Sequence, residues 1–267
     1  WEWSGPPLVP ARLAAHVRSR LAALGEPAVT LFEMVALARS IPVGALPELL
    51  TTDLHTVLAA ADALERAQFV RSAASPAALT VGHPLHAEIV VASLTPARRR
   101  AHAARLGQLP SGTESLDVYR RTVFLLEAGE PVAMQQLVDA ASLAHARGDH
   151  AGAVALSEVL VADGGGYVAH RLLAANRRPM GDIDGARASF RACVDLAESE
   201  WEVVNALNSL AELEFDCGDT PDVATAVLDE FGPNALLDTR RALHAVLLGD
   251  HQSAVAMLDH IATDALE

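Results

Sequence analysis

The stretch that decides the fold is ASLAHARGDHAGA, residues Ala141–Ala153, which has a Gly-Asp pair inside it and an alanine at each end. The pair recurs at Gly181, Gly218 and Gly249, with separations of 33, 37 and 31 residues. Small residues keep the same register: Ala141, Ala174, Ala211 and Ala242 stand seven positions before each glycine, and Ala153, Ala186, Val223 and Ala254 stand five positions after it. This pattern predicts an internal repeat.

The repeat has a physical explanation in paired helices. Glycine ends a first helix in the left-handed conformation, and the following aspartate caps a second helix. The small residues lie where the two helices touch, since larger side chains there would push the backbones apart. The spacing is close to the period of about 34 residues of tetratricopeptide repeats, and the array resembles that class. The predicted helix pairs are 131–147 with 149–162, 167–178 with 183–198, 200–216 with 221–231, and 235–248 with 251–263.

The composition favours a mostly all-α fold. Hydrophobic residues make up 51% of the chain and aromatic residues only 4%, a balance typical of helices packed through Ala, Leu and Val. No run of 18 apolar residues predicts a membrane helix. Cys193 and Cys217 form no metal-binding pattern and are expected to be reduced thiols in a cytoplasmic protein. A start at Trp1 without an initiator methionine indicates an internal piece of a longer protein.

Charge divides the chain near residue 110. Residues 1–110 contain ten Arg against eight acidic residues, whereas residues 111–267 contain ten Arg against 26. The change coincides with Leu109–Thr113, so we expect one domain over 1–110 and the repeat array over 111–267. So acidic an array would repel nucleic acid. The chain has no lysine and therefore no lysine-containing phosphate loop.

The first segment is typical of a degenerate winged helix. Apolar residues recur at helical spacing over 13–24, 29–38 and 54–64, with a short turn around Pro42 after the second helix. Two β-like pieces follow, Phe69–Arg71 and Leu79–Val81, which enclose a hairpin tip. The third helix would read DNA in such a fold. Its face carries Asp53, Asp62 and Glu65, so we favour a protein-packing module over direct DNA binding.

Two runs carry a family resemblance. HPLHAEIVVASLTPARRRAHAARL, His83–Leu106, and PARLAAHVRSRLAAL, Pro10–Leu24, resemble segments of the large ATP-binding LuxR-type regulators related to the maltose-regulon activator. The resemblance implies a parent protein with an ATPase domain that binds ATP or ADP and a DNA-binding domain, both outside this chain. It also implies a nucleotide-sensing role for His83, although Pro84 stands where a companion aspartate is usual. In the alternative interpretation, His83 caps the following helix.

The predicted function is regulatory. The repeat array would bind an inducer molecule or a protein on its concave face, with Asn176, Asn205, Asn208 and Glu212 as candidate contacts. The first domain would contact the nucleotide-binding domain of the parent chain. The alternative is a free-standing scaffold that binds proteins or peptides. The run Arg98–Arg100 indicates either a phosphate contact or a solvated face paired with acids. No catalytic constellation was found, so we expect no enzyme activity, cofactor or metal in this chain.

Overall fold

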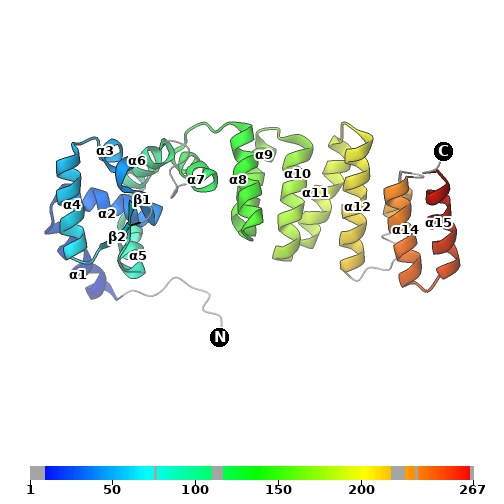
Figure 1. Cartoon of the computed structure of the whole chain (residues 1–267), viewed down its shortest axis with the longest axis horizontal. Coiled ribbons are helices and arrows are strands. Elements are labelled where there is room, and N and C mark those ends of the chain that lie inside the picture. Colours follow the sequence, from blue (N-terminus) through cyan, green and yellow to red (C-terminus); the bar gives the residue numbers. More distant parts are fainter. Residues whose placement is uncertain (1–9, 75–76, 110–116, 218–225, 232–233, 265–267) are drawn as a thin grey trace. The chain divides into compact units, whose positions relative to one another are not determined.

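The protein is described here by a computed structural model, which places residues 10–74, 77–109, 117–217, 226–231 and 234–264. These residues are mostly helical and include one small sheet, which confirms the prediction of a mostly all-α fold (Figure 1). The chain forms two compact units, Trp1–Ala133 and Met134–Glu267. Within the described ranges, no helix has both the length and the apolar character needed to cross a bilayer.

The first unit is organised around one central helix, α2. Its helices are α1 (Ala11–Ala22), α2 (Glu26–Ala38), α3 (Leu46–Leu50), α4 (Leu54–Arg66), α5 (Pro84–Ser93), α6 (Pro96–Gly107) and α7 (Val118–Ala128), with a 3-10 turn at Val43–Ala45. α2 is buried on nearly every side from Leu31 to Ala38 and contacts α1, α3, α4, α5 and α6. A helix that is apolar on almost every side is stable only in the interior of a fold, which explains its position.

A three-stranded antiparallel sheet packs near the C-terminal end of α2. It consists of β1 (Ser40–Pro42), β2 (Val70–Ala74) and β3 (Ala77–Val81), with β3 in the middle. Ser40 and Arg71 both pair with Thr80 from opposite sides. The predicted hairpin is confirmed, with longer strands. The turn predicted around Pro42 is present as the 3-10 turn Val43–Ala45, which begins directly after Pro42. Ser40–Pro42 form an edge strand that the sequence did not predict, a position where the missing N–H of proline is tolerated.

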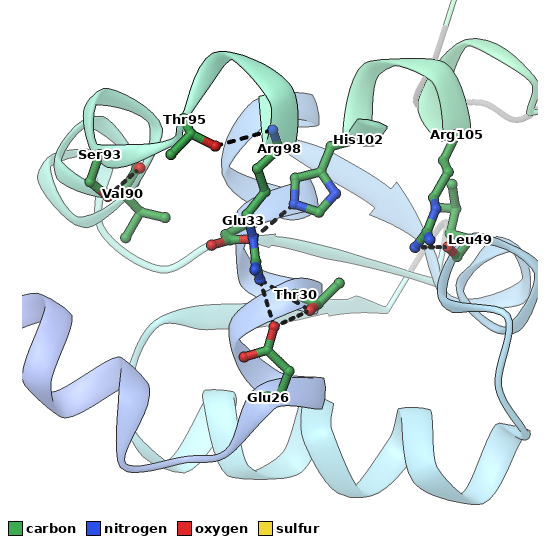
Figure 2. Close-up of polar contacts among 10 residues, drawn as sticks. All are labelled: Glu26, Thr30, Glu33, Leu49, Val90, Ser93, Thr95, Arg98, His102 and Arg105. Carbon is green, nitrogen blue, oxygen red and sulfur yellow. Dashed lines mark hydrogen bonds and ion pairs between the residues drawn. The ribbon is translucent and has the colours of Figure 1, made fainter. Parts of the chain in front are cut away.

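A buried acid on α2 links this helix to α6 (Figure 2). Oε2 of Glu33 accepts hydrogen bonds from Nε of Arg98 at 2.6 Å and from Nε2 of His102 at 2.8 Å. Nη2 of Arg98 also donates to Oε1 of Glu26 at 2.8 Å. A buried carboxylate is tolerated only when it is paired with a positive charge and hydrogen-bonded. α6 supplies the charge through Arg98 and a further hydrogen bond through His102.

The boundary between the two units differs from the predicted position at residue 110. α7 packs on α6, and the contact is close enough that a methyl group on Gly107 would lie 2.7 Å from Cδ2 of Leu125. α7 therefore belongs to the first unit, and the units divide between Ala133 and Met134. The change in charge predicted a boundary before α7, whereas the packing of α7 on α6 places the boundary after α7.

The second unit is a succession of helices in which each contacts the next described one. They are α8 (Met134–Ala146), α9 (His150–Ala162), α10 (Gly166–Arg177), α11 (Ile183–Leu196), α12 (Glu200–Asp216), α14 (Ala235–Leu247) and α15 (His251–Asp264), with a 3-10 turn at Arg178–Met180 (Figure 1). The described residues 226–231 include a helical turn at 226–229. The predicted pairs over 131–162, 167–198 and 235–263 are confirmed.

The Gly-Asp pairs have the predicted role at three of their four positions. Gly148, Gly181 and Gly249 have φ of +74°, +79° and +83°, and each ends a helical segment. The following aspartates accept hydrogen bonds from backbone N–H groups three residues later, at 3.0, 3.0 and 3.1 Å. The fourth pair, Gly218-Asp219, lies outside the described residues.

The small residues of the repeat are buried where helices meet. Ala141, Ala174, Ala211, Ala153 and Ala186 have no exposed surface, and Ala242 and Ala254 are 2% exposed. Val223 lies outside the described residues. The prediction that these positions are buried between helices is therefore confirmed at the described positions, where small side chains allow the helices to pack closely.

Candidate ligand-binding groove

A pocket of about 250 Å³ lies between α10 and α12, above α11. It follows from the helical period, because residues 167, 171, 175 and 178 fall on one side and residues 201, 205, 209 and 212 on the other. The lining residues are Tyr167, Arg171, Ala175, Arg178, Phe190, Cys193, Trp201, Asn205, Ala206, Ser209 and Glu212. We call this pocket the α10–α12 groove.

Aromatic side chains form one part of the groove. Trp201 is 68% exposed, the largest exposure among the large apolar side chains that the structure describes. Tyr167 is 8% exposed, and burial raises the pKa of its hydroxyl. A tryptophan that stays in water loses the apolar burial that normally stabilises it in a fold, so its exposure beside a pocket indicates a surface for contact.

The charged side chains of the groove differ in how they are paired. Arg178 forms ion pairs with Glu212 at 3.6 Å and with Asp216. Glu212 also lies 3.8 Å from Nη2 of Arg240. Arg171 is exposed and makes no ion pair with the residues that the structure describes. The end of the groove near Glu212 is therefore neutralised, whereas the Arg171 guanidinium remains available to an anionic or polar group.

The floor contains a buried thiol. Cys193 has no exposed surface, and its Sγ donates to the carbonyl oxygen of Tyr167 at 3.7 Å. Burial raises the pKa of this thiol to about 12, so it is un-ionised near neutral pH and acts as a small apolar group. Both cysteines are free thiols, and Cys217 is exposed.

Two of the four predicted contact residues line the groove, and two do not. Asn205 and Glu212 are among the lining residues. Asn208 is turned toward α14, where its Oδ1 accepts from Nε of Arg240 at 2.9 Å. Asn176 is fully buried, so it cannot present its amide on a binding surface.

Asn176 instead joins three helices. Its Oδ1 accepts from Nδ1 of His145 at 2.9 Å and from Nδ1 of His150 at 3.0 Å. Its Nδ2 donates to the carbonyl oxygen of Leu172 at 2.7 Å. Both lone pairs of the amide oxygen accept a hydrogen bond, which explains how this polar side chain can be buried.

Sequence reasoning missed Trp201, Arg171 and Tyr167. A signal for them was present: Tyr167 and Arg171 are one helical turn apart, as are Trp201 and Asn205. Reading the first helix of each predicted pair for aromatic and basic residues at this spacing would have found both sides of the groove.

A second pocket, of about 350 Å³, lies beside His83 in the first unit. Its lining residues are Glu65, Gln68, Val70, Arg71, Gly82, His83 and His86. Nδ1 of His83 accepts from the backbone N–H of Leu85 at 3.2 Å, which confirms the helix-capping interpretation. With Nδ1 used as an acceptor, the ring proton of neutral His83 lies on Nε2. Burial lowers the pKa of His86, and electrostatic interactions with His83 and Arg20 lower it further.

Acidic residues of the third predicted helix form hydrogen bonds or ion pairs with other residues of the first unit. Asp53 caps α4 by accepting from Thr56 N at 3.0 Å, and Asp62 pairs with Arg66 one turn away. Glu65 accepts from the backbone N–H and the hydroxyl of Ser72. The helix itself and its acid-rich character are as predicted.

The arginine run on α6 also has partners within its own unit. Arg98 is bound to Glu26 and Glu33, and Arg99 is paired with Glu127. Arg100 is exposed. Of the two interpretations left open for this run, pairing with acids is confirmed for two of the three residues.

No protein-family model matches this chain, and none of the curated proteins compared with it is significantly similar. Among the described residues, no group of three His, Cys, Asp or Glu side chains is arranged to hold a metal ion. The lining side chains of the α10–α12 groove determine what it can bind. They supply an aromatic face, one available guanidinium, an amide and a hydroxyl, which are groups suited to binding.

Proposed function

We propose that the second unit is a sensing arm that binds an inducer molecule or a protein in the α10–α12 groove. The observation that carries this proposal is the placement of Trp201 and Arg171 on facing helices, both exposed around one pocket. Aromatic and arginine side chains contribute most to binding energy at protein surfaces, and pockets that bind ligands combine apolar walls with a few polar groups. Binding, and no chemical transformation of the partner, is the proposed activity.

Fluorescence of Trp201 tests this proposal directly. In a chain carrying Trp1→Phe and Trp3→Phe, all tryptophan emission comes from Trp201. Screening small molecules and peptides should identify a ligand that shifts or quenches this emission. The same ligand should bind at least about tenfold more weakly to Arg171→Ala, because a charge-assisted hydrogen bond is lost. Arg147→Ala removes an exposed arginine outside the groove and should leave binding unchanged. Equal weakening by both variants would contradict the proposal.

The sensing arm is proposed to work inside a cytoplasmic, signal-responsive transcriptional activator of the LuxR-type class. The first unit supports this with the helices α2, α3 and α4, the strand β1 between α2 and α3, and the hairpin β2–β3 after α4. The resemblance of His83–Leu106 supports it as well. In this proposal the first unit contacts the nucleotide-binding domain of the parent chain. The genomic sequence on both sides of this chain tests it. A nucleotide-binding motif upstream and a helix-turn-helix downstream are expected, and their absence would remove the proposal.

His83 is proposed to sense the nucleotide held by that parent domain. The pocket beside His83 offers the Nε2–H of His83 and the guanidinium of Arg71, groups that can donate to a phosphate. The test is the amount of ADP that co-purifies with the parent protein. Retention should fall in His83→Ala and persist in His55→Ala. Unchanged retention in His83→Ala would leave the residue with its capping role alone.

Direct DNA binding by this chain is not part of the proposal, because Asp53 caps α4 and the acids Asp62 and Glu65 lie on it. Duplex binding at low salt, weakening steeply with added salt, would overturn this. A free-standing scaffold for proteins or peptides is the alternative. Such a scaffold would bind its partner in the same α10–α12 groove. Flanking sequence without regulatory domains would favour this alternative.

A further inference from the structure

A third cavity, of about 310 Å³, lies in the first unit among the end of α2, α5, α6 and α7. The proposed function does not use this cavity, although Arg99 of the run Arg98–Arg100 is one of its lining residues. Its apolar wall includes Leu37, Val91 and Val123, which come from three different helices. A cavity of this size with an apolar wall and a few polar groups at its rim has the general make-up of a small-molecule site.

Positive charge gathers at the rim of this cavity. Arg39, Arg99 and Arg120 line it, together with Glu127 as the acid among the described lining residues. Glu127 is paired with Arg99 and so does not compensate Arg39. The Arg39 side chain is exposed and forms no ion pair within the described ranges. The cavity therefore offers at least one guanidinium, that of Arg39, which is not paired with a carboxylate among the described residues.

The backbone of Arg39 is strained. It has φ of +63° and ψ of −33°, a region that glycine adopts easily and other residues rarely adopt. The conformation is fixed from both sides, because Arg39 ends α2 and its carbonyl oxygen accepts from Val81 N at 3.3 Å. No hydrogen bond or ion pair of the guanidinium with described residues offsets this strain. Strained backbone conformations of this kind cluster at active sites, ligand clamps and switch regions.

We propose that this cavity binds a small organic carboxylate. The carboxylate would accept hydrogen bonds from the Arg39 guanidinium, whose fork matches its two oxygens. The apolar part of the molecule would lie against Leu37, Val91 and Val123. Phosphate shares the affinity for arginine, but it would leave that apolar wall unused. The proposal is independent of the α10–α12 groove, which belongs to the other unit.

Calorimetric titration of the full chain at low salt tests this, with benzoate, inorganic phosphate and benzyl alcohol as probes. Benzoate should bind, phosphate should bind more weakly, and the neutral alcohol should not bind measurably. If phosphate binds as tightly as benzoate, the cavity is a general anion site and the carboxylate assignment is wrong.

Arg39→Gly separates the ligand role from a structural one. Glycine relieves the strained backbone, so the thermal midpoint should stay the same or rise, while benzoate affinity should fall at least about tenfold. Arg100→Ala removes one exposed positive charge from the same unit and Arg171→Ala removes one from the groove; neither should change benzoate binding. The proposal is overturned if benzoate does not bind, if Arg39→Gly binds it normally, or if Arg100→Ala weakens it equally.

Discussion

Arg98 on α6 holds Glu33 on α2 through a 2.6 Å hydrogen bond from Nε to Oε2, although 65 positions separate them in the sequence. His102 binds the same oxygen from one turn further along α6. Burial raises the pKa of Glu33, and hydrogen bonds from His102 and Arg98 lower it by more, so its pKa lies below the ordinary value of 4.5. The ionised form of this carboxyl therefore stabilises the folded first unit.

The pH dependence of stability should reveal this contribution. Because the pKa of Glu33 is lower in the folded chain, its stabilisation is complete above pH 4.5 and is lost as the pH falls through the folded-state pKa. We expect Glu33→Gln to lower the free energy of unfolding by about 2 kcal/mol at pH 7. The difference from the wild type should shrink toward pH 3 in urea titrations. The exposed Glu48→Gln should match the wild type throughout, and a constant difference for Glu33→Gln would contradict the assignment.

Loss of the Asn176 amide should destabilise the second unit. Asn176→Ala leaves the Nδ1–H groups of His145 and His150 without their acceptor, and we expect about 2 kcal/mol lower free energy of unfolding. Asn205→Ala removes a more exposed amide and should cost less than about 0.5 kcal/mol. Chemical denaturation of both variants measures the comparison. Equal costs would show that the buried junction contributes nothing specific.

The turn glycines should be sensitive to a single methyl group. A side chain at Gly181 would meet no atom within 4 Å, so the cost of Gly181→Ala comes from its positive φ alone. We expect about 1 kcal/mol of destabilisation in thermal or chemical unfolding. Gly44→Ala is the matched control, because that position is equally open and has no positive φ, and it should be neutral.

Enlarging a small residue between helices should be more costly than enlarging one on the surface. Ala174 has no exposed surface, so Ala174→Leu must displace neighbouring helices at a cost of about 1–3 kcal/mol. Ala155 is exposed on α9, and Ala155→Leu should change the free energy of unfolding by less than about 0.5 kcal/mol. If Ala174→Leu is tolerated equally well, close helix packing does not set the residue type at this register position.

The two thiols should react at very different rates. The pKa of Cys193 is raised to about 12, so almost none of it is thiolate at pH 8, and it is also buried. Alkylation of the folded chain with iodoacetamide, followed by mass spectrometry, should label exposed Cys217 and spare Cys193. In Cys217→Ser the native chain should remain unlabelled until it is unfolded. Rapid labelling of native Cys193 would show that the floor of the groove opens.

The sequence predicted the features that depend on local geometry. Gly181 and Asp182 end one helical segment and begin the next through their own backbone and side chain, so a two-residue signal was sufficient. Ala174 and Ala186 carried the packing signal because only small residues allow helices to approach closely. The all-α prediction and most helix bounds follow from these two causes.

Features that depend on a distant partner were not predicted. β1 is a strand because Ser40 pairs with Thr80, and nothing within three residues of Pro42 reveals that partner. The role of Asn176 similarly depends on His145 and His150, which lie on two earlier helices. For the groove, the helices were predicted, but not the rotation that turns Asn205 into it and Asn208 toward Arg240.

The Asn176 junction has a consequence for how the array can be divided. The turn between α8 and α9 is secured by a side chain from α10, which belongs to the following pair. The first pair is therefore not an autonomous module, and a protein truncated after Ala162 would be expected to fray at Gly148. Melting should accordingly be cooperative across the boundary between the first two pairs.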